Sequence, residues 1–208
     1  MTYDKLIINL TPTGMVPTKA DTPHVPVTPE EIAADCYRCY NVGASIVHIH
    51  ARGPDGTPTY RVEVFREIVS RVRAQCPELI ICVTTSGRTF KTFEERSQSL
   101  DLEGDLKPDM ASLTLGSMNF PKQASVNAPE MIRALAEKMR ERKIVPEMEV
   151  FDLGMIDYAK YLIDHGLLQE PFYFNLLLGS LGTLGGTPLH LATMVNELPP
   201  KATWAGAG

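Results

Sequence analysis

The strongest constraint on the fold is a regular alternation between two kinds of segment along all 208 residues. Short runs of apolar, β-branched residues, which are typical of buried strands, are each followed by a stretch with helical periodicity. Strands that alternate with helices form right-handed β-α-β units, and these units place the strands parallel in one sheet. The predicted strands span residues 5–12, 45–52, 79–86, 110–116, 144–151, 172–179 and 202–208.

Capping residues and apolar periodicity predict the helices between these strands. Thr28 and Glu31 form a capping box, with a proline at the first helical position. Asn127 and Glu130 show the same cap spacing at the start of another helix, and Gly166 marks the end of a third. The predicted helices cover residues 27–44, 61–75, 127–143, 155–166 and 187–198, with a weaker one at 91–103.

Seven strands joined by helical crossovers favour an α/β fold of the (β/α)₈ barrel type, whose typical length is about 250 residues. An open, doubly wound sheet is the alternative, but no G-x-G-x-x-G motif follows the first strand. We expect residues 1–208 to form a single barrel domain that is truncated after the seventh strand, without the eighth strand and the final helices.

Composition argues against several classes of protein. A net charge of −5 is atypical of a general nucleic-acid binder, and no apolar run is long enough to span a membrane. The N-terminal segment lacks the features of a secretory peptide. The four cysteines are therefore expected to be reduced thiols in a cytoplasmic protein.

Two histidines stand two residues apart near the end of the predicted strand 45–52. Side chains alternate across a strand, so His48 and His50 project to one face, at the end where barrels carry their active sites. Two buried imidazoles without partners would be costly, and a shared divalent ion, most simply zinc, would satisfy both. The alternative is that each histidine bonds to a neighbouring strand.

A catalytic zinc ion usually has three protein ligands, so a further donor is expected. Glu147 and Glu149 share one face of the predicted strand 144–151, where either could bind the ion or orient one of its ligands. Partial exposure at a strand end is the alternative for both glutamates. Hydroxyl-bearing residues also gather at the ends of other predicted strands, among them Thr84, Ser86, Ser112 and Thr114.

The order of these segments resembles the β-keto acid cleavage enzymes, of which the 3-keto-5-aminohexanoate cleavage enzymes are a branch. The matching segments are "LTPTG", "ASIVHIHAR", "TTSG", "MASLTLGSMNF", "VPEMEVFDLGMI", "LLLGSLGTLGG" and "ATWAGAG". The resemblance implies a (β/α)₈ barrel in a homo-oligomer, a dimer or a tetramer. It also implies an acyltransferase that condenses a β-keto acid with acetyl-CoA and releases acetoacetate and a new CoA thioester.

The same resemblance implies roles for individual residues. Zinc would be held by His48, by His50 and by a glutamate near the end of an eighth strand, beyond Gly208. The family's aspartate base and a nearby arginine lie in that same region. Among the implied catalytic and substrate-binding residues of this chain are Thr84, Ser86, Gly87, Ser112 and Glu149.

Val16 departs from the aminohexanoate branch of the family. The resemblance matches it to a glutamate that faces the substrate ammonium, and an apolar side chain cannot pair with an amine. Val16 is therefore expected to line the substrate site, with a neutral β-keto acid as the substrate.

Two other functions remain open at this point. A metal-dependent hydrolase of the amidohydrolase type also uses H-x-H on a barrel strand, but places the motif on the first strand and adds histidines on later strands. A truncated barrel could also be inactive, with exposed strand edges that invite association.

Overall fold

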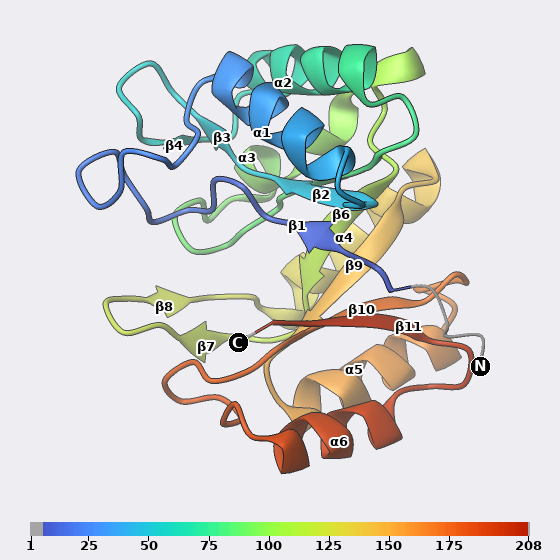
Figure 1. The fold of residues 1–208 in the computed structure, drawn as a ribbon. Coiled ribbons are helices and arrows are strands. Elements are labelled where there is room, and N and C mark those ends of the chain that lie inside the picture. The colour runs from blue at the N-terminus through green and yellow to red at the C-terminus, as the bar shows by residue number, and fades with distance from the viewer. Residues whose placement is uncertain (1–5, 208) are drawn as a thin grey trace, which may run out of the picture.

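The computed structural model describes residues 6–207 and has the predicted barrel architecture (Figure 1). Its main sheet is parallel, and strands that neighbour one another in space are consecutive along the chain, as repeated β-α-β units require. Lys5 and Gly208, at the outer ends of the first and last predicted strands, lie outside the described residues. The order is β1 (Asn9–Leu10), β2 (Ile46–Ile49), β5 (Ile80–Val83), β6 (Met110–Thr114), β9 (Val145–Val150), β10 (Tyr173–Leu177) and β11 (Thr203–Ala207).

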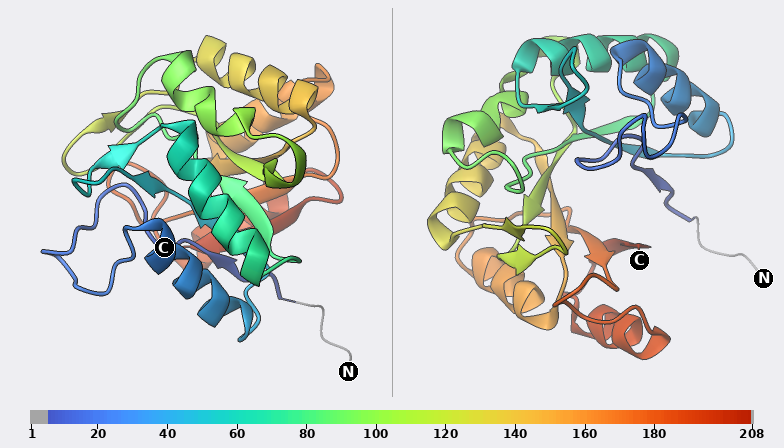
Figure 2. Two further views of the ribbon diagram at one scale, coloured as in Figure 1. Left: turned by 90° about the horizontal axis from the view of Figure 1, so that it is seen from above. Right: turned by 90° about the vertical axis from the view of Figure 1, so that its left-hand side faces the viewer.

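Helices cover the outside of the curled sheet (Figure 2). They are α1 (Pro29–Tyr40), α2 (Val62–Gln75), α3 (Phe93–Ser97), α4 (Pro129–Arg142), α5 (Leu153–Asp164) and α6 (Pro188–Glu197). The weak helix predicted before β6 is the short α3, followed by 3₁₀ turns at Gln98–Asp101 and Gly104–Leu106. The capping box of α1 forms as predicted, with Thr28 Oγ1 accepting from the Glu31 N–H at 3.2 Å. None of the described helices combines the length and apolarity needed to cross a bilayer.

The helix cap predicted at Asn127 is wrong. Helix α4 begins at Pro129, and its N-cap, Ala128, offers no side-chain hydrogen bond. The Asn127 side chain is used elsewhere: its oxygen accepts from Arg96 Nη2 at 2.7 Å, and its amide donates to the Gly116 carbonyl at 2.9 Å. A buried guanidinium must find acceptors, and here that requirement outweighs the helix end's need for a cap.

Two short antiparallel hairpins, which the strand pattern does not predict, extend from the carboxyl ends of the barrel strands. One pairs β3 (Ala51–Arg52) with β4 (Pro58–Thr59), and the other pairs β7 (Met118–Asn119) with β8 (Ala124–Ser125). The predicted strand 45–52 is therefore split into a barrel strand and a hairpin strand, and His50 lies between the two.

Strand alternation divides the interior into an apolar outer layer and a mixed inner one. Residues such as Val47, Ile81 and Leu113 face the helices and join the main hydrophobic core. A small apolar cluster of Ile46, Cys82, Met110 and Tyr173 is buried separately. The strands also bury His48, Ser112, Glu147 and Asn175, so polar groups are built into the same sheet.

The sheet stays open between its first and last strands. No pairing joins β1 to β11 among the described residues, and Figure 2 shows the gap between the first and last strands. A cavity of about 1150 Å³ is lined by residues of both strands. Trp204 on β11 is 40% exposed beside this gap. The seven strands therefore form a nearly closed barrel with two unpaired edges.

A matched pair of leucine substitutions tests this assignment of the core. Leu113→Ala removes a fully buried side chain and is expected to lower the free energy of unfolding by about 2–5 kcal/mol. Leu189→Ala, at a position 73% exposed on α6, is expected to change it by less than about 0.5 kcal/mol. Urea unfolding followed by circular dichroism measures both values. Equal losses for the two variants would contradict the described packing.

Candidate active site

His48 is fixed by a buried hydrogen bond inside the sheet. It lies on β2, is only 2% exposed, and its Nδ1 lies 2.5 Å from Oε2 of Glu147 on β9. A carboxylate accepts only, so Nδ1 carries the proton and donates. This bond leaves Nε2 as the atom through which the ring can meet a ligand.

Glu147 is the most heavily bonded carboxylate of the interior. Besides His48, three donors reach it: Asn9 Nδ2 at 2.6 Å, Asn175 Nδ2 at 3.3 Å and the Cys82 thiol at 3.3 Å. Burial opposes its ionisation, but the imidazolium of His48 and these donors outweigh burial and keep the pKa of Glu147 below 4.5. The alternative of partial exposure is wrong for Glu147, whose exposure is 0%.

The two histidines of the H-x-H motif lie against each other. Their rings are stacked with centroids 4.9 Å apart and an interplanar angle of 17°. Burial lowers the pKa of His48, but Glu147 outweighs burial and raises it to about 9. Burial, reinforced by the charge of neighbouring cations, lowers the pKa of His50 well below 6.5, so this ring is neutral at pH 7.

Within residues 6–207, each ring keeps one buried nitrogen without a hydrogen-bond partner. These atoms are His48 Nε2 and His50 Nδ1. In this part of the chain, neither histidine bonds to a backbone carbonyl. The alternative, in which each histidine only bonds to another strand, therefore fails for His50. For His48 it describes one nitrogen, Nδ1, which bonds to Glu147. Paired, buried, unsatisfied imidazole nitrogens are the environment that a divalent cation would satisfy, and Glu147 is then the carboxylate that orients the first ligand.

A second grouping of potential ligands lies on the other side of His48. Ligand atoms of His48, Cys82 and Glu147 all lie within 4.8 Å of one another. A cation there would have to displace the hydrogen bonds that Glu147 already accepts. Burial and the neighbouring carboxylate also raise the pKa of the Cys82 thiol well above 9.0, which disfavours the thiolate that binds metals. The unpartnered nitrogens therefore mark the better site.

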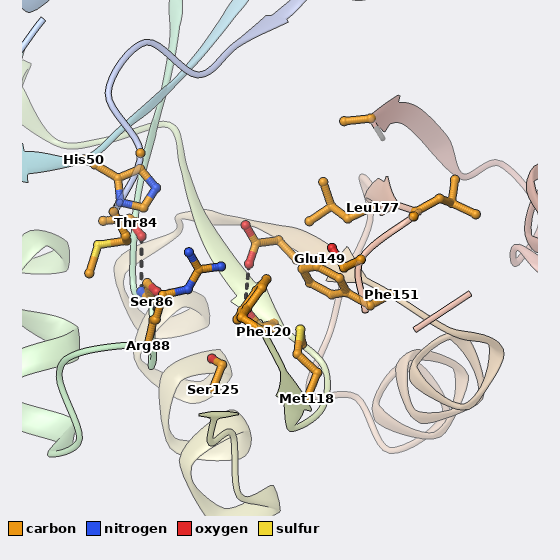
Figure 3. Close-up of a pocket in the computed structure, with 17 residues that line it drawn as sticks. His50, Thr84, Ser86, Arg88, Met118, Phe120, Ser125, Glu149, Phe151 and Leu177 are labelled. Atoms are coloured by element: carbon orange, nitrogen blue, oxygen red, sulfur yellow. Dashed lines mark hydrogen bonds between the residues drawn. The ribbon is translucent and has the colours of Figure 1, made fainter. Parts of the chain in front are cut away.

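A cavity of about 470 Å³ opens beside His50 at the carboxyl ends of the strands (Figure 3). The strand ends and the β7–β8 hairpin supply its walls, as expected for the catalytic face of a barrel. Its polar lining includes His50, Thr84, Ser86, Arg88, Thr114, Ser125 and Glu149. Apolar side chains complete it, including Met15, Met118, Phe120, Phe151, Leu177 and Leu178.

Glu149 lines this cavity, unlike Glu147. Its Oε2 accepts a hydrogen bond of 2.5 Å from Thr114 Oγ1, a contact drawn in Figure 3. Parallel pairing sets this contact, because Thr114 and Glu149 are register partners on β6 and β9. Burial raises the pKa of Glu149 above 4.5, although the neighbouring charge of His48 opposes the shift. The two glutamates therefore differ in environment, one locked in a network and one facing open space.

The "TTSGR" segment after β5 forms another wall. Thr84 and Ser86 line the cavity, and the Ser86 N–H donates to Thr84 Oγ1 at 3.1 Å (Figure 3). Gly87 lies behind them, where an added Cβ would come within 2.7 Å of Arg96 Nη1 and 2.8 Å of the Val126 carbonyl. Only glycine fits there without displacing the segment.

Besides His48 and Gly87, the predicted site residues Ser112 and Val16 do not line the cavity. Ser112 is buried, and its Oγ accepts from the Thr85 N–H at 3.0 Å while its carbonyl accepts from Thr85 Oγ1 at 2.6 Å, so it anchors the segment after β5. Val16 is 54% exposed, and its neighbour Met15 faces the cavity in its place.

Sequence reasoning missed Arg88 and Phe120. The guanidinium of Arg88 lies over the Phe120 ring, with Cζ 3.4 Å from the ring centroid. The position of Arg88 directly after the "TTSG" segment could have indicated it as a site residue. Phe120 had no such indication, because it belongs to the loop of an unpredicted hairpin. All four cysteines are free thiols, in agreement with the prediction.

Comparison with known proteins places this site in a family. The family model for β-keto acid cleavage enzymes matches residues 5–208. A 3-keto-5-aminohexanoate cleavage enzyme of Fusobacterium nucleatum subsp. nucleatum is 39% identical over 206 residues, which cover 99% of this chain and 74% of the relative. A 3-oxoadipate:acetyl-CoA acetyltransferase of Cupriavidus necator is 35% identical over 205 residues, covering 97% of this chain and 70% of the relative.

A solved structure has a similar fold. The apo structure of ObcA aligns with a TM-score of 0.70 and 26% sequence identity, over 78% of this chain and 38% of ObcA. The chain thus spans under two fifths of ObcA's length and about three quarters of the curated relatives' length. The names of the relatives agree with the predicted acyltransferase class. The chain belongs to the β-keto acid cleavage enzyme family, as the order of its segments predicted.

Proposed function

We propose that this chain carries most of the active site of a zinc-dependent enzyme that condenses a β-keto acid with acetyl-CoA, releasing acetoacetate and a new CoA thioester. The observation that carries the proposal is the pair of unpartnered imidazole nitrogens, on His48 and His50, beside a cavity that also holds Glu149. Relatives named for transferring groups from 3-oxoadipate and from 3,5-dioxohexanoate to acetyl-CoA support the reaction class. The expected homo-oligomer and cytoplasmic location stay predictions.

His48 and His50 would hold the zinc ion through those nitrogens, and the family resemblance adds a glutamate of an eighth strand as the third ligand. When bound, zinc would supply a Lewis acid that polarises the substrate ketone. Glu147 keeps the His48 ring in one orientation with the Nδ1 proton facing the carboxylate, so that Nε2 would bind the ion once its own proton is displaced.

The walls of the cavity supply groups for the keto acid. Thr84 Oγ1 accepts from the Ser86 N–H, so the hydroxyl proton of Thr84 is free to be donated to a substrate carboxylate. Thr114 occupies only Oε2 of Glu149, which leaves Oε1 to take up and return a proton. Its raised pKa brings Glu149 closer to the range in which a carboxyl exchanges protons efficiently.

The amidohydrolase alternative has lost its support. The strands after β2 carry no histidine, and the family match covers the chain from residue 5 onward. Turnover of a substrate without CoA is the result that would restore it.

Zinc content tests the proposed ligands. His48→Ala and His50→Ala are each expected to lower the zinc bound by the purified protein at least about tenfold, because each removes one of few ligands. Cys82→Ser is expected to keep the metal, because the thiol lies on the side of His48 that faces Glu147. Elemental analysis by mass spectrometry gives the ratio of metal to protein.

The control for this series is His165→Ala, at an exposed position after α5 where Nδ1 lies 2.7 Å from the Tyr161 carbonyl. Loss of zinc in Cys82→Ser together with its retention in His50→Ala would instead put the ion among His48, Cys82 and Glu147.

Product analysis tests the reaction itself. The longest native polypeptide that contains residues 1–208, loaded with zinc, is expected to form acetoacetate and a new acyl-CoA from acetyl-CoA and a β-keto acid. Glu149→Gln is expected to lower kcat by about 100-fold or more with little change in KM. The amide keeps the shape of the side chain but cannot take up a proton as the carboxylate does. Chromatography with mass spectrometry detects both products. No acetoacetate from any member of a panel of β-keto acids would reject the proposal.

A further inference from the structure

Arg88 places a positive charge in the wall of the cavity. It follows the "TTSG" segment, is half-buried, and lies with its guanidinium Cζ 3.4 Å from the centroid of the Phe120 ring (Figure 3). Phe120 follows β7 in the hairpin beyond the end of β6, so the stacked pair joins this hairpin to the segment after β5. Stacking on an aromatic face fixes the plane of a guanidinium and leaves its N–H edges free.

Those edges have no protein partner among residues 6–207. No carbonyl accepts a hydrogen bond from the Arg88 guanidinium, and no carboxylate forms an ion pair with it in this part of the chain; only its backbone groups are bonded. The two buried arginines behave differently: Arg52 donates to three backbone carbonyls, and Arg96 donates to two carbonyls and to the Asn127 side chain. Arg88 alone of these three keeps its donors for something else.

Burial lowers the pKa of Arg88 and the charge of the other charged residue in the cavity wall opposes that shift, but the two form no ion pair. Glu149 faces the same space, but its Oε2 is held by Thr114, and no ion pair joins it to Arg88 (Figure 3). Apolar side chains complete the lining, with Met118, Phe151 and Leu177 among them. The cavity thus combines the polar groups of Thr84, Ser86 and His50, an apolar wall, and the guanidinium of Arg88.

We propose that Arg88 is the residue that determines substrate specificity, and that it binds a second carboxylate, carried by the keto acid at the end of its chain. The preferred substrates are then dicarboxylic β-keto acids with a short aliphatic spacer. The proposal rests on the proposed function, because it takes the first carboxylate to lie beside Thr84 and Ser86. It replaces the neutral keto acid expected from Val16 alone, since Val16 does not line the cavity.

The chemistry of the pocket favours an anion over an amine at this position. A substrate ammonium would meet the Arg88 cation at the hairpin, and the expected counter-charge at position 16 is replaced by an exposed valine. A carboxylate would instead accept two parallel N–H bonds from a guanidinium that Phe120 already holds in place.

The test compares two substrates that differ only in the second carboxylate, 3-oxohexanedioate and 3-oxohexanoate, with acetyl-CoA and the zinc-loaded full chain. Wild type is expected to prefer the diacid. Arg88→Met is expected to lower kcat/KM for the diacid about 10- to 100-fold and to change that for the monoacid by less than about threefold. Arg88→Lys, which keeps the charge but loses the planar fork, is expected to fall in between.

The matched control is Arg66→Met, an exposed arginine on α2, which is expected to leave both values unchanged. Thermal unfolding checks that each variant is folded. An equal loss for both acids in Arg88→Met would mean that Arg88 binds the carboxylate common to them, and a rise confined to the KM for acetyl-CoA would mean that it binds CoA. Either result, or no change at all, overturns the proposal.

Binding separates this proposal from the proposed function. If no keto acid is turned over, the reaction class is wrong, but titration calorimetry with hexanedioate and hexanoate still reports on Arg88. Hexanedioate is expected to bind wild type at least about tenfold more tightly than it binds Arg88→Met, with no such difference for hexanoate. Equal affinities of hexanedioate for the two proteins would reject the role of Arg88.

Discussion

The structure depends on one buried carboxylate in the polar interior of the barrel. Glu147 accepts hydrogen bonds from groups on β1, β2, β5 and β10, so one side chain joins five strands of the sheet. A buried charge costs several kcal/mol unless such donors surround it, and a shift of one residue in any strand would turn its donor away. The same bonds hold the His48 ring where it stacks on His50, so the register of the sheet and the geometry of the histidine pair have a common origin.

Local patterns in the sequence were enough for the architecture and for the histidine pair. Strand and helix periodicity, the Thr28 capping box and the H-x-H spacing all act over a few residues, and each appears in the structure as predicted. The roles of Glu147 and Glu149 could not be separated in this way. The partners that distinguish them, Asn9 and Thr114, lie 138 and 35 residues away in the sequence, and only the curled sheet brings them near.

Competition between partners explains what the sequence could not reveal. Asn127 has the spacing of a helix cap, but the buried guanidinium of Arg96 takes its oxygen. In the sequence Arg88 is an ordinary loop arginine, and only the β7–β8 hairpin places Phe120 against its guanidinium. In both places a long-range contact decides what a residue does, and propensity or motif matching has no access to that contact.

The close approach at Gly87 has a consequence for anyone who would redesign this pocket. Any side chain there would collide with Arg96 and with the backbone at Val126, both of which belong to the scaffold behind the wall. The Arg88 side chain, one residue further on, lines the cavity and stacks on the Phe120 ring. A mutant library that varies residue 88 therefore changes ligand preference without disturbing the surrounding structure. A library that varies residue 87 would mostly yield variants in which Arg96 and the backbone at Val126 are displaced.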